Sequence, residues 1–125
     1  MIVGIGVDLV EIKRIRQLID RFGDTFLHRA FTPAERQEGM LRYNPAPYFA
    51  GRWAVKEAVA KALGCGIGAD CASVEVETCN GTAGKPVTRL SGNAAKTMEK
   101  LGAKTVHISL SHEANYATAY VILEK

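Results

Sequence analysis

Apolar residues in the first half of the chain recur at the spacing of an α-helix. Over residues 9–22 they return every three or four positions, and Gly23 follows, which predicts a helix that ends at this glycine. Residues 2–7 alternate apolar side chains with glycine and predict a short strand before that helix. The apolar stripe of the predicted helix consists of Ile12, Ile15, Ile19 and Phe22.

Two more helices are indicated by the residues at their ends. Thr32 and Glu35 fit a capping box around Pro33, so a helix should begin here and stop before the proline-containing residues 44–47. Residues 49–64 are rich in alanine and finish on a glycine, which predicts a long helix closed by a left-handed turn. After its opening strand, the first half of the chain is therefore expected to be helical.

The second half changes to a period of two, which is the pattern of half-buried strands. Helices in the first half and antiparallel strands in the second predict an α+β fold, with helices packed on a mostly antiparallel sheet. At 125 residues the chain can build one core, so residues 1–125 are expected to form a single domain. The predicted strands are 72–78, 87–90, 105–111 and 116–123, the last two forming a hairpin across 112–115, and a helix capped by Ser91 should occupy 92–101.

The amino-acid composition limits the classes of protein to which the chain can belong. Hydrophobic residues make up 47% of the chain and charged residues 23%, as in ordinary globular proteins. No apolar run is long enough to cross a bilayer, and the amino terminus lacks the basic segment of a secretory signal, so we expect a cytoplasmic protein with no membrane partner. Cys65, Cys71 and Cys79 lack Cys-x-x-Cys spacing, so we expect reduced thiols rather than a zinc site or disulfides.

Positive charge is concentrated near the first predicted helix. The net charge is +3, and residues 12–31 alone hold three more cations than anions. Such a surface can attract an acidic partner, although most charge runs are simply solvated helix faces. The aromatic residues of this stretch have core-like spacing, so no nucleic-acid partner is expected. The cations of the helix are Lys13, Arg14, Arg16 and Arg21.

The long predicted helix carries the most informative polar residues. Glu57 and Lys61 are four positions apart and share one face, while Arg52 and Lys56 add two more cations within two turns. A carboxylate in such surroundings stays ionised and can hold a metal ion, while the cations can meet phosphate. The same pattern also describes an alanine-rich core helix with an ordinary surface ion pair worth about 0.3–0.5 kcal/mol.

Asp8, at the end of the first predicted strand, has two interpretations. Together with Glu11 it fits a capping box for the following helix. Alternatively, it faces a cleft and shares a magnesium ion with Glu57, because magnesium takes one or two protein carboxylates and fills its other positions with phosphate oxygens and water. Sequence spacing alone leaves both interpretations open.

Other motifs argue against familiar nucleotide and hydrolase sites. Gly4-Ile5-Gly6 begins a dinucleotide-binding motif, but Leu9 replaces its third glycine. His112 follows Ser109 and Ser111 at a strand end, yet no Gly-x-Ser-x-Gly elbow accompanies it, which excludes a hydrolase triad of that kind. These hydroxyl and imidazole groups could instead donate hydrogen bonds to a phosphate.

Three segments of the chain form a joint pattern. They are Gly4-Ile5-Gly6-Val7-Asp8-Leu9-Val10-Glu11-Ile12, then Phe49-Ala50-Gly51-Arg52-Trp53-Ala54-Val55-Lys56-Glu57-Ala58 with Lys61-Ala62-Leu63-Gly64, and Ser109-Leu110-Ser111-His112 with Tyr116-Ala117-Thr118-Ala119-Tyr120-Val121. In this order they resemble the holo-acyl-carrier-protein synthase family, the small bacterial type of 4′-phosphopantetheinyl transferase. The resemblance spans nearly the whole chain, and its first two segments are specific when they occur together.

This resemblance implies a magnesium-dependent enzyme of fatty acid biosynthesis. Such an enzyme moves the phosphopantetheine arm of coenzyme A to a serine of apo-acyl carrier protein and releases adenosine 3′,5′-bisphosphate. By similarity, Asp8 and Glu57 hold magnesium, and Glu57 or a metal-bound water takes the serine proton. Lys61 stabilises the phosphoryl oxygens. The residues expected to line the coenzyme A site are Arg52, Lys61, Gly64, Gly66, Lys85, Pro86, Ser109 and His112.

The resemblance also implies a homotrimer with active sites between subunits, and a basic first helix that docks the acidic carrier protein through Lys13, Arg14, Arg16 and Arg21. The chain departs from the family at Cys65, where members often have threonine, and the role of Cys65 stays open. Two other functions remain possible at this point. One is a noncatalytic module that binds RNA or an acidic protein, and the other is a metal-dependent phosphohydrolase that uses the same carboxylates with water.

Overall fold

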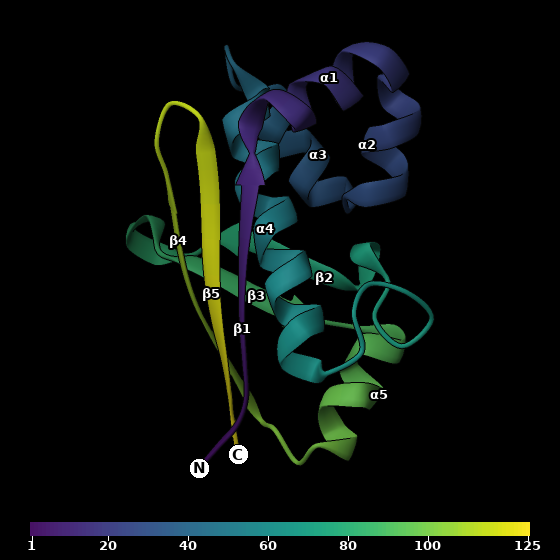
Figure 1. The fold of residues 1–125 in the computed structure, drawn as a ribbon, viewed down its shortest axis with the longest axis vertical. Coiled ribbons are helices and arrows are strands. Elements are labelled where there is room, and N and C mark those ends of the chain that lie inside the picture. Colours follow the sequence, from purple (N-terminus) through teal and green to yellow (C-terminus); the bar gives the residue numbers. More distant parts are fainter.

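The computed structural model describes residues 1–125 and shows one long helix lying against a three-stranded antiparallel sheet (Figure 1). The sheet has the order β1-β5-β4, and a separate two-stranded sheet pairs β2 with β3. This arrangement confirms the predicted α+β class. The strands are β1 (Ile2–Glu11), β2 (Val76–Asn80), β3 (Pro86–Leu90), β4 (Thr105–His112) and β5 (Tyr116–Glu124); the helices are α1 (Ile12–Phe22), α2 (Asp24–Ala30), α3 (Pro33–Met40), α4 (Pro45–Leu63) and α5 (Gly92–Lys100), with 3₁₀ turns at Ser73–Glu75 and Thr82–Gly84.

Strand β1 lies directly on α4 because two of its inward positions, Gly4 and Gly6, carry no side chain. A methyl group added at Gly6 would collide with the backbone carbonyl of Ala58, and one added at Gly4 would collide with that of Ala62. Alternation along the strand places Asp8 on the same face, two residues beyond Gly6. This glycine–alanine seam (Gly4, Gly6, Ala58 and Ala62) therefore brings the carboxylate of Asp8 to the surface of α4.

The core forms between α4 and the inner face of the three-stranded sheet. On α4 the side chains of Ala54, Val55 and Ala58 are fully buried, and β5 contributes the equally buried Ala119 and Leu123. Small side chains predominate in this layer, so the helix packs close to the sheet. Even α4, the longest helix, lacks the extended apolar character that a membrane-crossing helix needs, and no other helix has it.

The predicted end signals of α3 and α4 are confirmed, with one shift. Thr32 Oγ1 accepts a hydrogen bond from the backbone N–H of Glu35 at 3.3 Å, and Glu35 Oε1 accepts one from the N–H of Thr32 at 3.0 Å. Helix α4 begins at Pro45, earlier than the expected residue 49, because a proline in the first turn lacks only an N–H that has no helical partner. It ends at Gly64 with φ 82°, as predicted.

The prediction that a helix starts at residue 9 is wrong. Strand β1 continues to Glu11, and α1 starts at Ile12. Asp8 pairs with Ala119, and Glu11 makes no side-chain cap hydrogen bond, so the capping-box interpretation of these two acidic residues is also wrong. The distant strand β5 supplies backbone partners along residues 8–11, and this pairing outweighs the local helix signal.

Glu75 explains two further differences from the expected elements. Its Oε1 accepts the N–H of Ala72 at 2.9 Å and closes the 3₁₀ turn over Ser73–Glu75, so β2 starts four residues later than predicted. Its Oε2 accepts the N–H of Asn93 at 2.7 Å at the start of α5. Ser91, the predicted cap of that helix, makes no side-chain cap hydrogen bond. The carboxylate of Glu75 thus holds both the 3₁₀ turn and the first turn of α5 in place.

These hydrogen bonds hold the pKa of Glu75 below its usual value, with the Ala72 N–H as the largest cause. A lowered folded-state pKa means that the ionised carboxylate adds stability above its unfolded-state pKa, and that this stability is lost as the pH falls through the folded-state value. Glu75→Gln should therefore lower the thermal midpoint near neutral pH, and its difference from the unsubstituted chain should shrink as the pH falls below about 4.5.

Thermal unfolding followed by circular dichroism, from about pH 3 to about pH 7, measures this difference. Glu99→Gln is the control, because Glu99 is an exposed carboxylate on α5 whose side chain makes no hydrogen bond or ion pair. A midpoint difference for Glu75→Gln that stays constant with pH would contradict the capping role.

Candidate active site

Lys61 connects α4 to β1 through Val7 and Asp8. Its Nζ lies 3.1 Å from Oδ1 of Asp8 and donates to the backbone carbonyl of Val7 at 2.9 Å. The Asp8 side chain is 16% exposed and that of Lys61 is 52% exposed, so the cation covers the more buried carboxylate. The ion-pair partner of Lys61 is therefore Asp8, rather than Glu57 one turn earlier on the same helix.

Glu57 lies close enough to Asp8 for their negative charges to interact. Burial is the main cause that raises the pKa of Glu57, and the charge of Asp8 raises it further. The cations Lys61 and Arg14 partly oppose this rise. Two partly buried carboxylates that repel each other are stabilised by a cation placed between them, so the electrostatics here favour a bound metal ion.

The donor atoms of this carboxylate–lysine cluster (Asp8, Glu57 and Lys61) fit magnesium. Both acidic side chains offer carboxylate oxygens, the hard ligands that magnesium prefers. The chain contains no group of three or more His, Cys, Asp or Glu side chains arranged to hold a metal. Two carboxylates are nevertheless the number that magnesium takes when phosphate oxygens and water supply its remaining ligands.

Helix α4 presents a second polar face, turned away from the carboxylate–lysine cluster. Arg52 and Lys56 are one turn apart and both contact the region of β2. Arg52 and Lys61 are nine positions apart, which corresponds to about half a turn around the axis and about 14 Å along it. Lys56, expected as a cation available to phosphate, is instead fully buried. One chain therefore does not bring Arg52 to the cluster.

Arg52 lines a hollow of about 320 Å³. Its Nη2 donates to Oδ1 of Asn80 at 3.1 Å, and its guanidinium carbon lies 4.4 Å from the centre of the Tyr48 ring. The Nε of Arg52 is buried without a hydrogen-bond partner, which is costly for a donor and would be relieved by an anion. This anion hollow is lined by Arg42, Asn44, Pro47, Tyr48, Gly51, Arg52, Asn80, Leu110 and His112.

Four polar side chains of the anion hollow were not predicted as site residues: Arg42, Asn44, Tyr48 and Asn80. Tyr48 lies one turn before Arg52 on α4. Its four-residue spacing from Arg52 on one helix predicts a stacked cation–π pair, and this pattern could have identified Tyr48 in the sequence. Asn80 lies 28 residues from Arg52, and no local pattern links the two.

The predicted residues Lys85, Pro86 and His112 lie near the anion hollow, whereas Ser109 does not. Pro86 pairs with Asn80 across the β2–β3 hairpin, and Lys85 precedes it. His112 lines the hollow itself. Ser109 is three residues from His112 on β4 and so points from the opposite face of the sheet.

Gly64 and Gly66 lie beyond the C-terminal end of α4, nearer to Lys61 than to Arg52 along the chain. Their φ angles are 82° and 68°, a backbone region that favours glycine. Twelve positions separate Gly64 from Arg52, or about 18 Å along the helix. Apart from Ser109, the predicted coenzyme A residues therefore form two groups in one chain, one with Lys61 towards the C-terminal end of α4 and one around the anion hollow.

The basic helix α1 starts directly after β1 and is exposed along its charged face. Arg16 donates to Asn44 at 3.4 Å, and the guanidinium of Arg21 lies 5.2 Å from the ring centre of Phe22. Arg14 is near enough to Glu57 to influence its pKa, so the basic surface adjoins the carboxylate–lysine cluster. The predicted docking residues Lys13, Arg14, Arg16 and Arg21 are all exposed.

On the face of the three-stranded sheet that is turned away from α4, strands β1 and β5 present mostly apolar side chains. Ile5 is 70% exposed, Leu9 66% and Tyr120 61%. A hollow of about 440 Å³ on this face includes Lys61 of the cluster among its lining residues. Contiguous exposed apolar surface is typical of protein–protein interfaces. The apolar residues of β1 and β5 on this side, which we call the outer sheet face, are Ile5, Val7, Leu9, Tyr116, Tyr120 and Ile122.

Comparison with known proteins places the chain in a family. The sequence profile described as the 4′-phosphopantetheinyl transferase superfamily matches residues 4–121. The chain belongs to this superfamily. The holo-[acyl-carrier-protein] synthases of Desulforudis audaxviator and Edwardsiella ictaluri are 48% and 45% identical to it over 122 and 123 residues. Each match covers 98% of this chain, with 92% and 98% of the respective relative.

Solved structures of phosphopantetheinyl transferases agree with this assignment. The holo-[acyl-carrier-protein] synthase of Neisseria meningitidis has a TM-score of 0.92 at 38% identity and covers 100% of both chains. The synthase of Bacillus anthracis in complex with CoA (3′,5′-ADP) has a TM-score of 0.85 at 35% identity, covering 100% of this chain and 98% of that one. The predicted family and enzyme class are confirmed, so a noncatalytic binding module is rejected.

Proposed function

We propose that this transferase moves the 4′-phosphopantetheine group of coenzyme A to a serine of apo-acyl carrier protein in fatty acid biosynthesis, with magnesium, and releases adenosine 3′,5′-bisphosphate. The observation that carries the proposal is the carboxylate–lysine cluster, in which Lys61 pairs with Asp8 and the charges of both act on Glu57. The names of the relatives support the carrier protein as acceptor, and the complex of the Bacillus anthracis synthase supports coenzyme A as donor.

Each residue of the cluster has a distinct task in this reaction. Asp8 and Glu57 would hold magnesium, which neutralises charge on the phosphates when it is bound. Lys61 is placed to donate to a phosphoryl oxygen beside Asp8. Glu57 lies within electrostatic reach of Asp8, and its carboxylate would accept the serine proton, directly or through a water. The serine oxygen bonds to phosphorus as the bond from phosphorus to the departing adenosine phosphate breaks.

The separation of the two groups of coenzyme A residues supports a site shared between subunits. Helix α4 directs Arg52 away from the cluster, so a single chain does not surround the ligand. The outer sheet face is apolar and includes Lys61 at its hollow, so covering this face would bring a neighbouring subunit to the cluster. We infer a homotrimer in which the cluster of one subunit meets the anion hollow of the next, where Arg52 and His112 bind phosphate.

Charge reversal on α1 tests the docking of the carrier protein. Arg14→Glu is expected to raise the KM for apo-carrier protein about tenfold and the KM for coenzyme A less, because the substituted helix repels an acidic partner. Lys100→Glu is the matched control, since it makes the same charge change on the exposed end of α5, at the opposite end of the molecule (Figure 1). The effect of Arg14→Glu should weaken as salt is added. An unchanged KM for the carrier at low salt would argue against docking on α1.

Incubation with coenzyme A, magnesium and apo-acyl carrier protein tests the proposed function. Mass spectrometry should show the carrier gaining one phosphopantetheine group, and chromatography should show an equal amount of adenosine 3′,5′-bisphosphate. Release of the bisphosphate without a mass gain on the carrier would instead identify a phosphohydrolase that uses the same carboxylates with water. No product in either assay would refute the proposal.

A further inference from the structure

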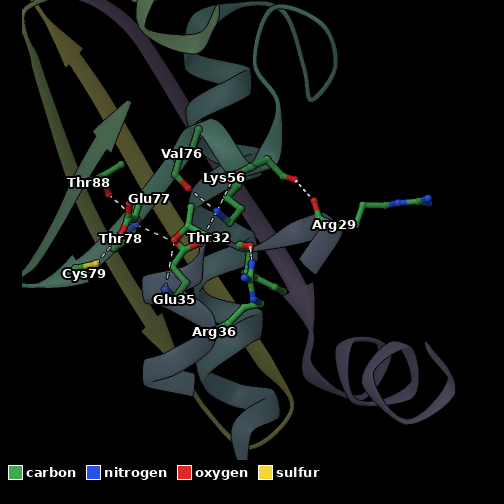
Figure 2. Close-up of polar contacts among 12 residues, drawn as sticks. Arg29, Thr32, Glu35, Arg36, Lys56, Val76, Glu77, Thr78, Cys79 and Thr88 are labelled. Atoms are coloured by element: carbon green, nitrogen blue, oxygen red, sulfur yellow. Dashed lines mark hydrogen bonds and ion pairs between the residues drawn. The ribbon is translucent and has the colours of Figure 1, made fainter. Parts of the chain in front are cut away.

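The reaction described above does not use the buried ion pair between α3 and α4. Lys56 Nζ lies 2.7 Å from Oε1 of Glu35, and both side chains are 0% exposed. Figure 2 shows the lysine reaching between Glu35 and the backbone of β2. Burying two charges is costly unless their hydrogen-bonding groups are all satisfied, so the contacts of this pair indicate what it stabilises.

Both charged groups bind the backbone around the start of β2. Lys56 Nζ donates to the carbonyl of Ser73 at 2.7 Å and to that of Val76, so with Glu35 all three ammonium protons have acceptors. Glu35 Oε2 accepts the backbone N–H of Thr78 at 3.0 Å. The pair is therefore hydrogen-bonded to the 3₁₀ turn and to two positions of β2.

The ion pair takes the place of a neighbouring strand along one edge of β2. Val76 and Thr78 are two residues apart, so their backbone groups point to the same edge of the strand. Strand β3 pairs with β2 along its other edge. Lys56 and Glu35 supply the donor and the acceptor that a third strand would otherwise supply. The position of β2 relative to α4 is therefore fixed by side chains.

Asn80 ends the same strand, and its Oδ1 accepts the hydrogen bond from Arg52, one turn before Lys56 on α4. We propose that the buried pair of Lys56 and Glu35 positions β2 so that Asn80 holds the guanidinium of Arg52 in the anion hollow. Lys56 and Glu35 are thus positioning residues for coenzyme A, which they do not touch. This role rests on the proposed function, because coenzyme A is the ligand assigned to the hollow.

Removing both charges tests the proposal. The double variant Glu35→Gln with Lys56→Met keeps similar side-chain volumes and leaves one amide oxygen as an acceptor. It should raise the KM for coenzyme A about tenfold, while kcat and the KM for the carrier stay within about twofold, because the binding of one substrate is what changes. Glu35→Gln alone leaves the buried Lys56 cation without its counter-charge, so it should lower the thermal midpoint more than the double variant, and it should raise the same constant in the same direction. A wild-type KM for coenzyme A in a folded variant would overturn the proposal.

Asn80→Ala provides the decisive comparison, because it breaks the contact to Arg52 and leaves the ion pair intact. Asn80 is exposed, so this variant should fold even if the variants of the ion pair do not. We expect a similar rise in the KM for coenzyme A. Combining it with Glu35→Gln should add little, since both changes act through one contact. The proposal would be overturned if the two changes raised the KM for coenzyme A by factors that multiply in the double variant. A wild-type KM for coenzyme A in Asn80→Ala would also overturn it.

Thr88→Val controls for a general loosening of the hairpin. The hydroxyl groups of Thr88 and Thr78 are buried and lie 2.8 Å apart, so the valine removes a hydrogen bond between β2 and β3 without touching the ion pair. It should lower the thermal midpoint and leave the KM for coenzyme A unchanged. An equal rise in KM for Thr88→Val would also count against the proposal. Absence of transfer by the unsubstituted enzyme would instead refute the proposed function.

Discussion

Asp8→Ala and Glu57→Ala are each expected to reduce phosphopantetheinyl transfer about a thousandfold or more while the chain stays folded. Each variant removes one of the two carboxylates proposed to hold magnesium, and Glu57→Ala also removes the proposed base. Stability should change little, because the ion pair between Asp8 and Lys61 is half exposed on its lysine side and such pairs contribute about 0–1 kcal/mol.

The carrier-protein mass assay measures transfer, and circular dichroism with thermal unfolding measures the fold. Glu99→Ala is the control, because it removes an exposed carboxylate on α5 whose side chain makes no hydrogen bond or ion pair. Turnover at the unsubstituted rate from Glu57→Ala would remove this residue from both proposed roles. Loss of transfer accompanied by unfolding would show that the carboxylate is needed for the fold instead.

Mixing two inactive variants separates a shared site from one built within a single chain. Asp8→Ala damages the carboxylate–lysine cluster, and Arg52→Ala damages the anion hollow. If sites form between subunits, chains unfolded and refolded together should regain part of the activity, because some sites combine an intact cluster with an intact hollow. No gain over the separate variants, with mixed assemblies confirmed by native mass spectrometry, would refute the shared site.

Gly6→Ala is expected to cause the largest loss of stability among single methyl additions to the chain. The new methyl group would meet the backbone carbonyl of Ala58, which cannot rotate aside as a side chain could. Strand β1 would have to move away from α4, at a cost of about 1–3 kcal/mol or more. We therefore expect a fall in thermal midpoint of about 5–10 °C. Transfer should also fall, because the shift moves Asp8 relative to Glu57.

Gly68→Ala is the matched control for this change. Nothing lies within 4 Å of a methyl group placed there, and the φ angle of Gly68 is not positive, so its midpoint should equal or slightly exceed that of the unsubstituted chain. Differential scanning calorimetry on both variants measures the effect. Equal midpoints for Gly6→Ala and Gly68→Ala would show that the glycine–alanine seam tolerates separation.

The elements that the sequence predicted well are those with short-range signals. The capping box of Thr32 and Glu35 and the helix end at Gly64 depend only on residues within a few positions, and both appear as expected. Asp8 and Glu11 satisfied the same kind of local rule, yet they lie in a strand. Its partners are in β5, and Thr118, which donates to the carbonyl of Asp8, is 110 residues away. No local pattern could have supplied that information.

The candidate site divides in the same way. The shared face of Glu57 and Lys61 follows from helix periodicity, but the contact of Lys61 with Asp8 spans 53 residues and became visible only in the fold. Lys56 has the same spacing from Arg52 that Lys61 has from Glu57, and nothing local marks it as buried. Its burial depends on a carboxylate from α3 and on carbonyls at the start of β2, both of which lie outside the helix.

The opposed polar faces of α4 have a consequence for the cell. If a complete site requires two copies of the chain, activity depends on the concentration at which copies associate as well as on the number made. Below that concentration, the rate of transfer falls more steeply than the amount of protein, because each separate chain carries only part of the site. A modest change in expression would then act as a sharp control on how quickly newly made carrier protein is activated.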